Sequence, residues 1–229
     1  MKIFLDTANL EEIRKAAELG LVDGITTNPT LIAKEGAGFK QQIQEICSII
    51  PGDVSAETIS TDWQGMVKEG KELATWAPNV VVKAPCTPDG LRATKALSDE
   101  GIKVNVTLIF SAAQGLLACK NGAYIISPFI GRLDDLGLDG MELVRELVEI
   151  KHNYDYRAQV LAASIRTPNH VIEAAKAGAD IATLPAAVFN SLFKHALTDV
   201  GMTRFLADWK TLPNYEEAIF PKKQAAGAR

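Results

Sequence analysis

The stretch VVVKAPCTPDG, residues 80–90, contains the features that decide the fold. Three consecutive valines are typical of a strand that is buried on both faces. Lys83 follows them directly, and Pro85, Pro88 and Gly90 then predict a turn out of the strand. We therefore expect a buried strand that ends in a charged residue and leads into a turn.

The same arrangement recurs along the chain as a short apolar strand, a polar end, a turn and an amphipathic stretch. The predicted strands are rich in Val, Ile or Thr. They cover residues 2–6, 24–28, 53–58, 79–83, 103–108, 124–128, 158–164 and 180–185. Strands that alternate with helices in this way predict a parallel sheet covered by helices.

Helical periodicity is clearest in four of the connecting stretches, residues 10–20, 62–77, 139–154 and 167–179. The residues that begin and end helices agree with this pattern. The predicted N-caps are Asp62, Ser111, Asp139 and Thr167, and the predicted terminal glycines are Gly20, Gly101, Gly122 and Gly178.

Eight strand–helix units in a chain of 229 residues predict an α/β fold, the closed (β/α)8 or TIM barrel. The alternative, an open doubly wound sheet, is disfavoured because no Gly-rich GxGxxG loop follows the first strand. We predict a single domain over residues 1–212 and a C-terminal tail over residues 213–229.

Residues 198–212, within the predicted domain, indicate an additional C-terminal helix after the eighth unit. Its apolar stripe would pack either on the helix's own barrel or on a neighbouring subunit. The side chains of this stripe are Met202, Phe205, Leu206 and Trp209.

Composition argues against several classes of protein. A net charge of −4 is unlike the basic surface of a nucleic-acid-binding protein. No apolar run approaches the roughly 20 residues of a membrane span, and the N-terminus has no signal-peptide pattern. The three cysteines are widely spaced and unpaired in pattern. We therefore expect a cytoplasmic protein without disulfides, membrane or nucleic-acid partners.

Polar residues close seven of the eight predicted strands, and in a barrel of this kind the active site lies at that end of the strands. The eighth strand ends in Leu184 and Pro185 and offers little. Gathering so many polar groups at one rim costs several kcal/mol unless they pair or serve a function. The rim residues are Asp6, Thr26, Thr27, Asn28, Glu57, Lys83, Asn105, Thr107, Ser127, Ser164 and Arg166.

Lys83 is the most informative of these residues. Burial disfavours the charged form of an amine, and a neutral amine can form a Schiff base with a carbonyl carbon. The alternatives are a lysine that extends to the surface or one that pairs with Glu57 or Asp6. Because the same rim carries carboxylates and amides, we favour a catalytic lysine.

Asp6 and Glu57 are the candidate acid–base groups. Forming a Schiff base moves protons onto and off the carbinolamine oxygen, and cleaving the adjacent carbon–carbon bond needs a base for a hydroxyl. Each carboxylate could instead be a helix N-cap or a salt-bridge partner, and Asp6 could cap the first helix.

Arg132 and Arg166 lie on neighbouring predicted rim loops, and Ser164 accompanies Arg166. Arginine forks suit phosphate oxygens, and barrels often hold phosphate near their later strands. These residues predict a phosphorylated substrate. The alternative is an ion pair of Arg132 with Asp134 or Asp135.

No metal site stands out in the sequence. The three histidines, His152, His170 and His195, are separated and lie in or beside helical segments. We expect neither a metal nor a cofactor, so the lysine itself would activate the carbonyl carbon.

The motifs at successive strand ends resemble the short branch of the transaldolase family. The motifs that carry the resemblance are FLDTAN, GITTNPTL, VSAET, VVVKAPCTPDGLRA, VNVTLIFS, SPFIGRLDD and LAASIRTPNH, and the resemblance covers residues 1–212. The fructose-6-phosphate aldolases, which share the barrel and the lysine, are close relatives of this branch.

The resemblance implies roles for four catalytic residues. Lys83 matches the Schiff-base lysine, and Asp6 matches the acid–base aspartate of carbon–carbon cleavage. Glu57 and Thr107 match the pair that holds the catalytic water.

The resemblance also implies which residues bind the substrate. Those that match the groups binding the dihydroxyacetone part are Asn28, Asn105 and Ser127. Those that match the phosphate site are Arg132, Ser164 and Arg166.

Glu57 and Phe129 separate the two branches of this family. The aldolases typically have Gln and Tyr at these positions, so the pair here follows the transaldolase pattern. A phenol at position 129 would supply a proton donor to the water, whereas phenylalanine donates no hydrogen bond. The resemblance therefore implies that the fragment is transferred and not released.

The resemblance implies a transaldolase of the non-oxidative pentose phosphate pathway. It would move a dihydroxyacetone unit from sedoheptulose 7-phosphate or fructose 6-phosphate to an aldose phosphate. The alternatives are a fructose-6-phosphate aldolase and a sugar-phosphate-binding barrel without chemistry. The family's short members also imply a homo-oligomer, a pentamer or decamer.

Overall fold

The computed structural model describes residues 1–36 and 38–220. The chain groups into two compact units, one from Met1 to Phe189 and one that starts at Asn190. The division into a domain over residues 1–212 and a tail over residues 213–229 stays a prediction. Residues 221–229 of that tail lie outside the described residues.

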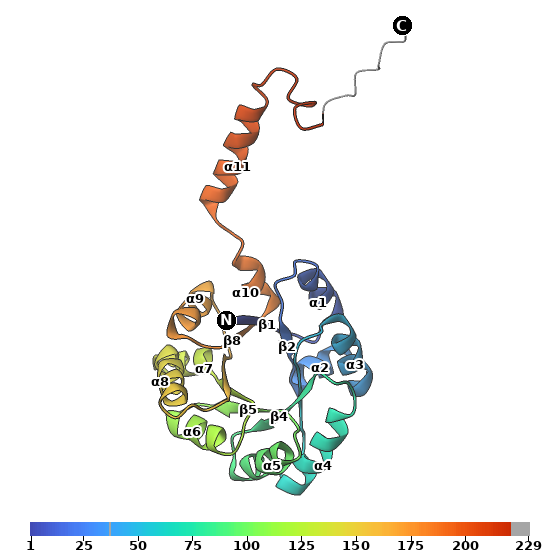
Figure 1. Ribbon diagram of the computed structural model, residues 1–229, viewed down its shortest axis with the longest axis vertical. Coiled ribbons are helices and arrows are strands. Elements are labelled where there is room, and N and C mark those ends of the chain that lie inside the picture. Colours follow the sequence, from blue (N-terminus) through green and yellow to red (C-terminus); the bar gives the residue numbers. More distant parts are fainter. Residues whose placement is uncertain (37, 221–229) are drawn as a thin grey trace. The chain divides into compact units, whose positions relative to one another are not determined.

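The first unit is a closed barrel of eight parallel strands in sequential order, with the last strand paired to the first (Figure 1). The strands are β1 Lys2–Asp6, β2 Gly24–Thr26, β3 Val54–Glu57, β4 Val80–Pro85, β5 Val104–Ile109, β6 Ile125–Pro128, β7 Gln159–Ala162 and β8 Ile181–Leu184. Each overlaps a predicted strand, so the (β/α)8 barrel is confirmed.

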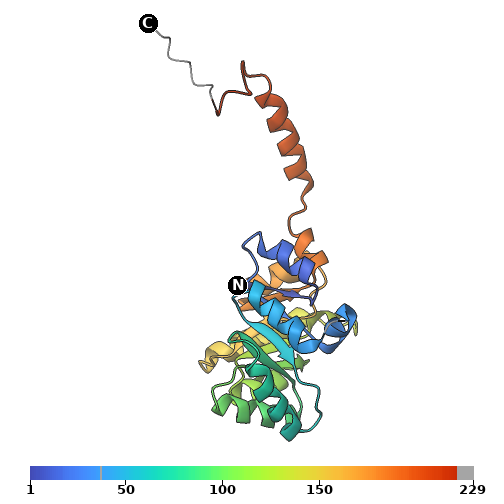
Figure 2. The same cartoon turned by 90° about the vertical axis from the view of Figure 1, so that its right-hand side faces the viewer.

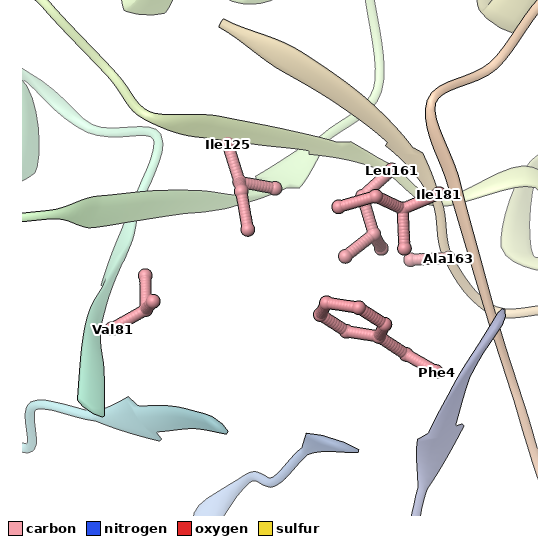
Figure 3. Packing of buried hydrophobic residues seen from close by; sticks show 6 residues of the cluster. All are labelled: Phe4, Val81, Ile125, Leu161, Ala163 and Ile181. Atoms are coloured by element: carbon pink, nitrogen blue, oxygen red, sulfur yellow. The ribbon is translucent and has the colours of Figure 1, made fainter. Parts of the chain in front are cut away.

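Side chains alternate between the two faces of β4. Val81 points into the barrel, where it belongs to an apolar cluster that Figure 3 shows converging between the strands. Val82 faces outward, since a Cβ added to Gly70 would lie 3.2 Å from its side chain. Only one of the three valines therefore shares the inward face of the strand with Lys83. The cluster consists of Phe4, Val81, Ile125, Leu161, Ala163 and Ile181.

Helices follow the strands along the chain and surround them (Figure 1). They are α1 Leu10–Ala17, α3 Phe39–Ile49, α4 Trp63–Ala74, α5 Pro88–Asp99, α6 Ala112–Lys120, α8 Gly140–Asn153 and α9 Pro168–Ala177. All four predicted N-caps accept a backbone N–H bond with their side chains, and all four predicted terminal glycines have positive φ. The helix boundaries thus follow the local capping chemistry.

Two short helices escape the sequence pattern because they are too brief to show a period. These are α2, Pro29–Glu35, and α7, Ile130–Asp134. Both follow strand ends directly, and both carry or adjoin a polar side chain of the predicted rim.

The remaining helices lie at the end of the described chain. They are α10, Ala186–Ser191, and α11, Ala196–Trp209, which appears as one continuous helix in Figure 2. The predicted additional helix is therefore confirmed. No residue of α11 is buried, and its predicted apolar stripe is exposed. Which surface covers that stripe stays a prediction. None of the described helices combines the length and the apolar character that crossing a membrane requires.

Gly90 allows α5 to approach the end of β4 closely. Its N–H donates to Thr87 Oγ1 at 3.0 Å, and a Cβ in its place would lie 1.9 Å from the carbonyl oxygen of Pro85. Because that atom belongs to the backbone, the helix would have to move to accept a side chain.

We expect Gly90→Ala to lower the free energy of unfolding by about 1–3 kcal/mol, as overpacking does. In thermal unfolding this corresponds to a loss of about 2–4 °C in Tm for each kcal/mol. Gly201→Ala in α11 is the matched control, since nothing lies within 4 Å of its added Cβ. Equal effects of the two substitutions would contradict the close-approach explanation.

Candidate active site

A small cavity of about 100 Å³ lies where the carboxyl ends of the strands meet. Nine of the predicted site residues line it, and Glu57 and Arg166 do not. The predicted residues in the lining are Asp6, Asn28, Lys83, Asn105, Thr107, Ser127, Phe129, Arg132 and Ser164.

Lys83 is buried, with 6% of its surface exposed. Its Nζ donates to the carbonyl oxygen of Thr27 at 3.0 Å and lies 3.0 Å from Glu57 Oε2. The alternative prediction of a lysine that extends to the surface is therefore wrong, whereas the alternative prediction of an ion pair with Glu57 is confirmed. That pair is compatible with catalysis, because it places a proton acceptor beside the amine.

Glu57 reaches the lysine from outside the small cavity. It is Lys83's register partner in the paired strands β3 and β4. Its side chain also lines a larger cavity of about 520 Å³, between α3, α4 and the loop after β3, together with Phe39 and Trp76. The carboxylate thus stands between the buried amine and a second cavity.

Asp6 ends β1 and accepts a hydrogen bond from Thr26 Oγ1 at 2.8 Å. Burial raises the pKa of Asp6 above its ordinary value, and the Thr26 bond, Lys83 and Arg132 oppose this rise. The alternative role as helix cap is wrong, because Asn9 caps α1. A carboxyl group with a raised pKa is suited to take up and return a proton.

Thr183 shows that the eighth strand contributes to the site, contrary to the sequence prediction. Its hydroxyl lies 2.7 Å from Thr26 Oγ1, so Thr183 can donate to Thr26 while Thr26 donates to Asp6. Both threonines line the cavity. The signal for Thr183 in the sequence is the two-residue alternation, since Thr183 follows the inward-facing Ile181 by two positions.

Asn105 and Ser127 form a buried polar chain across three strands. Ser127 Oγ donates to Asn105 Oδ1 at 2.7 Å, and Asn105 Nδ2 donates to Ser55 Oγ at 3.1 Å. Asn28 also lines the cavity, and its side chain caps α2 through the N–H of Leu31 at 2.9 Å. These bonds fix the orientation of the amide groups.

Thr107 has a free hydroxyl. Within the described part of the chain, its Oγ1 is the one buried side-chain nitrogen or oxygen without a hydrogen-bond partner. Buried polar atoms are nearly always satisfied, by protein or by ordered water. The next residue, Leu108, has φ 58, and the register with β6 shifts there. A strained backbone therefore adjoins a hydroxyl that a water or ligand can satisfy.

The two predicted phosphate arginines differ in position. Arg132 lines the cavity, lies 4.9 Å from the Phe129 ring and makes no ion pair with any described residue. Its alternative pairing with Asp134 or Asp135 is thus wrong. Arg166 lies outside the cavity and forms an ion pair with Asp135.

Ser164 lies at the small cavity, whereas the three histidines do not line it. Ser164 lines the cavity with φ 59. His170 lies 3.2 Å from Asp134, and His195 caps α11. Over residues 1–36 and 38–220, no group of three His, Cys, Asp or Glu side chains could hold a metal ion.

The described residues place a buried lysine, two carboxylates and an arginine without an ion pair of its own at the mouth of a (β/α)8 barrel. This arrangement defines a class of barrel with a lysine-centred polar site. The sequence matches the family described as Transaldolase/Fructose-6-phosphate aldolase over residues 3–229. The chain belongs to this family.

Curated relatives agree with this assignment. A "Probable transaldolase" of Caldicellulosiruptor saccharolyticus is 58% identical over 214 residues, which cover 93% of this chain and 99% of the relative. Proteins with the same name from Roseiflexus sp. (strain RS-1) and Anaeromyxobacter sp. (strain K) are 59% and 56% identical over 92% and 93% of this chain. These matches cover 97% and 98% of the two relatives.

We expect Asp6→Asn to stabilise the protein at neutral pH. The raised pKa means that folding favours the protonated acid, so stability is lost as pH rises through the folded-state pKa. The amide removes this loss, and Tm at pH 7 should rise by about 2–4 °C, the shift that ~1 kcal/mol produces in a chain of this size.

The gain from Asp6→Asn should shrink as pH falls toward 3.8, the ordinary value for aspartate. Glu146→Gln, at an exposed position of α8, makes the same chemical change as a control. A Tm for Asp6→Asn that falls at pH 7 would contradict the assigned cost of the buried carboxylate.

Proposed function

We propose that this protein is a transaldolase that works through a Schiff base on Lys83. It moves a dihydroxyacetone unit from sedoheptulose 7-phosphate or fructose 6-phosphate to an aldose phosphate. The observation that carries the proposal is the buried amine of Lys83, 3.0 Å from Glu57 and lining one cavity with Asp6. The names of the curated relatives support the same activity.

The first step joins the donor to the enzyme. Glu57 takes a proton from the Lys83 ammonium group, and the free amine attacks the keto carbon of the donor. Glu57 then gives its proton to the hydroxyl of the resulting carbinolamine, which leaves as water, and an iminium ion remains. The unsatisfied hydroxyl of Thr107 supports its proposed role of holding this water with Glu57.

The second step breaks the bond between carbons 3 and 4 of the donor. Asp6 takes the proton of the C4 hydroxyl, and C4 with its oxygen becomes the aldehyde group of the departing aldose. The electrons of the broken bond move into the iminium and give an enamine. The aldose product leaves, and the enamine carbon then attacks the aldehyde carbon of the acceptor. Asp6 returns its proton to the new hydroxyl, and water releases the product from Lys83.

The remaining residues bind the two ends of the sugar. We assign the dihydroxyacetone part to Asn28, Asn105 and Ser127, whose polar groups line the cavity. We assign the phosphate to Arg132, Ser164 and Arg166. Arg132 lines the cavity and forms no ion pair with a described residue, which supports this direction of binding.

Glu57 and Phe129 favour transfer over release of dihydroxyacetone. Phe129 lines the cavity but carries no proton donor, so the enamine persists until an acceptor arrives. Fructose-6-phosphate aldolase remains the rival activity within this family. A sugar-binding barrel without chemistry would have no use for the pairing of Lys83 with Glu57.

We place this activity in the non-oxidative pentose phosphate pathway of the cytoplasm, without a cofactor. We also propose that the protein is a homo-oligomer, a pentamer or decamer, as implied for the short members of the family. The exposed apolar stripe of α11 supports an assembly.

Borohydride reduction in the presence of fructose 6-phosphate tests the central proposal. We expect a stable dihydroxyacetone or hexose adduct on the peptide that contains Lys83, identified by mass spectrometry. Lys83→Met should abolish it, since no amine remains to form the iminium. An adduct on Lys95 or Lys103 alone would refute the mechanism.

Phe129→Tyr tests the account of transfer against release. The phenol supplies a proton donor at the cavity, so the ratio of dihydroxyacetone release to transfer should rise by about 10-fold or more. Phe110→Tyr is the matched control, because that ring contacts Phe129 at 5.7 Å but does not line the cavity. An unchanged ratio in Phe129→Tyr would reject the role assigned to position 129.

A further inference from the structure

Asp135 forms an ion pair with Arg166, the predicted phosphate-binding arginine that does not line the small cavity. Both terminal nitrogens of Arg166 donate to its carboxylate, Nη1 to Oδ1 and Nη2 to Oδ2. Both side chains are about half exposed. Arg132, by contrast, lines the cavity and has no carboxylate partner among the described residues.

The Arg166 side chain packs directly against Gly131. A Cβ at this position would lie 2.8 Å from Arg166 Nε and 2.3 Å from the carbonyl oxygen of Ser164. The N–H of Gly131 donates to that same oxygen at 3.1 Å. The first turn of α7 is therefore joined to the segment after β7, and the Arg166 stem crosses this junction toward Asp135, the C-cap of α7.

We propose that Asp135 is an internal competitor for phosphate at Arg166, and thereby a specificity-determining residue. This inference rests on the proposed function, because it concerns how the phosphate of that substrate is received. The planar fork that binds a carboxylate in two bonds binds phosphate oxygens in the same geometry. A phosphate that takes Arg166 must therefore displace Asp135.

Replacing the Asp135 carboxylate by a phosphate at Arg166 costs little free energy. An exposed arginine–carboxylate pair contributes little, and a phosphate monoester carries close to two negative charges where Asp135 carries one. Asp135 nevertheless weakens every phosphate bound there, both by holding Arg166 and by like-charge repulsion. It limits the affinity for phosphorylated sugars and for inorganic phosphate alike, and leaves unphosphorylated sugars unaffected.

Asp135→Asn tests this role. We expect the KM for fructose 6-phosphate to fall about 3- to 10-fold with kcat not increased, and the KM for unphosphorylated fructose to stay unchanged. The Kd of inorganic phosphate, measured by calorimetric titration, should fall by a similar factor. A carboxylate that merely positions Arg166 predicts the opposite changes.

Asp134→Asn is the matched control, because this neighbouring aspartate forms its ion pair with His170 and acts on Arg166 through its charge alone. It should change phosphate binding much less than Asp135→Asn does. In an Arg166→Gln background, Asp135→Asn should lose most of its effect, since the residue it competes for is gone. An equal gain in that background would show general repulsion and overturn the competition.

A Kd for phosphate that is unchanged or higher in Asp135→Asn overturns the inference, whether or not the enzyme turns over. Because phosphate binding requires no reaction, loss of the Lys83 adduct would overturn only the proposed function. An adduct on Lys83 together with unchanged phosphate binding would overturn only the competition.

Discussion

The ion pair between Lys83 and Glu57 is the interaction on which the site depends. An amine buried within the carboxyl-terminal half of β4 needs partners, since an unpaired charge in a barrel interior would cost several kcal/mol. Glu57 supplies the opposite charge and Thr27 a carbonyl oxygen, each at 3.0 Å. The adjacent strands β3 and β4 carry Glu57 and Lys83 in register, so the pairing of the two strands brings the carboxylate to the amine.

The same geometry separates the functions of the two carboxylates. Glu57 contacts the amine and borders the larger cavity, whereas Asp6 lines the small cavity and is supported by Thr26 and Thr183. Burial raises the pKa of Asp6 against the attraction of Lys83 and Arg132. One carboxylate can therefore serve the lysine while the other exchanges a proton with substrate.

The sequence predicted all eight strands and the lysine-centred rim, because strand ends in a parallel barrel must meet. It could not predict α2 and α7, since helices this short show no period. Thr183 was missed because only the last residues of the eighth strand were considered, whereas Thr183 lies one position before the end of β8. Asp135 pairs with Arg166 and not with Arg132, and only the folded arrangement of α7 shows which arginine that carboxylate contacts.

Successive side chains of β4 face the barrel interior and the covering helices in turn, so the two sets of positions can evolve separately. Val82 packs outward near α4, while Val81 and Lys83 face the interior. Alternate positions of each strand therefore face either the covering helices or the barrel interior. Substitutions at inward positions near the mouth can alter the chemistry while the outward positions keep the helices in place. The barrel can thus be kept while the reaction that it performs changes.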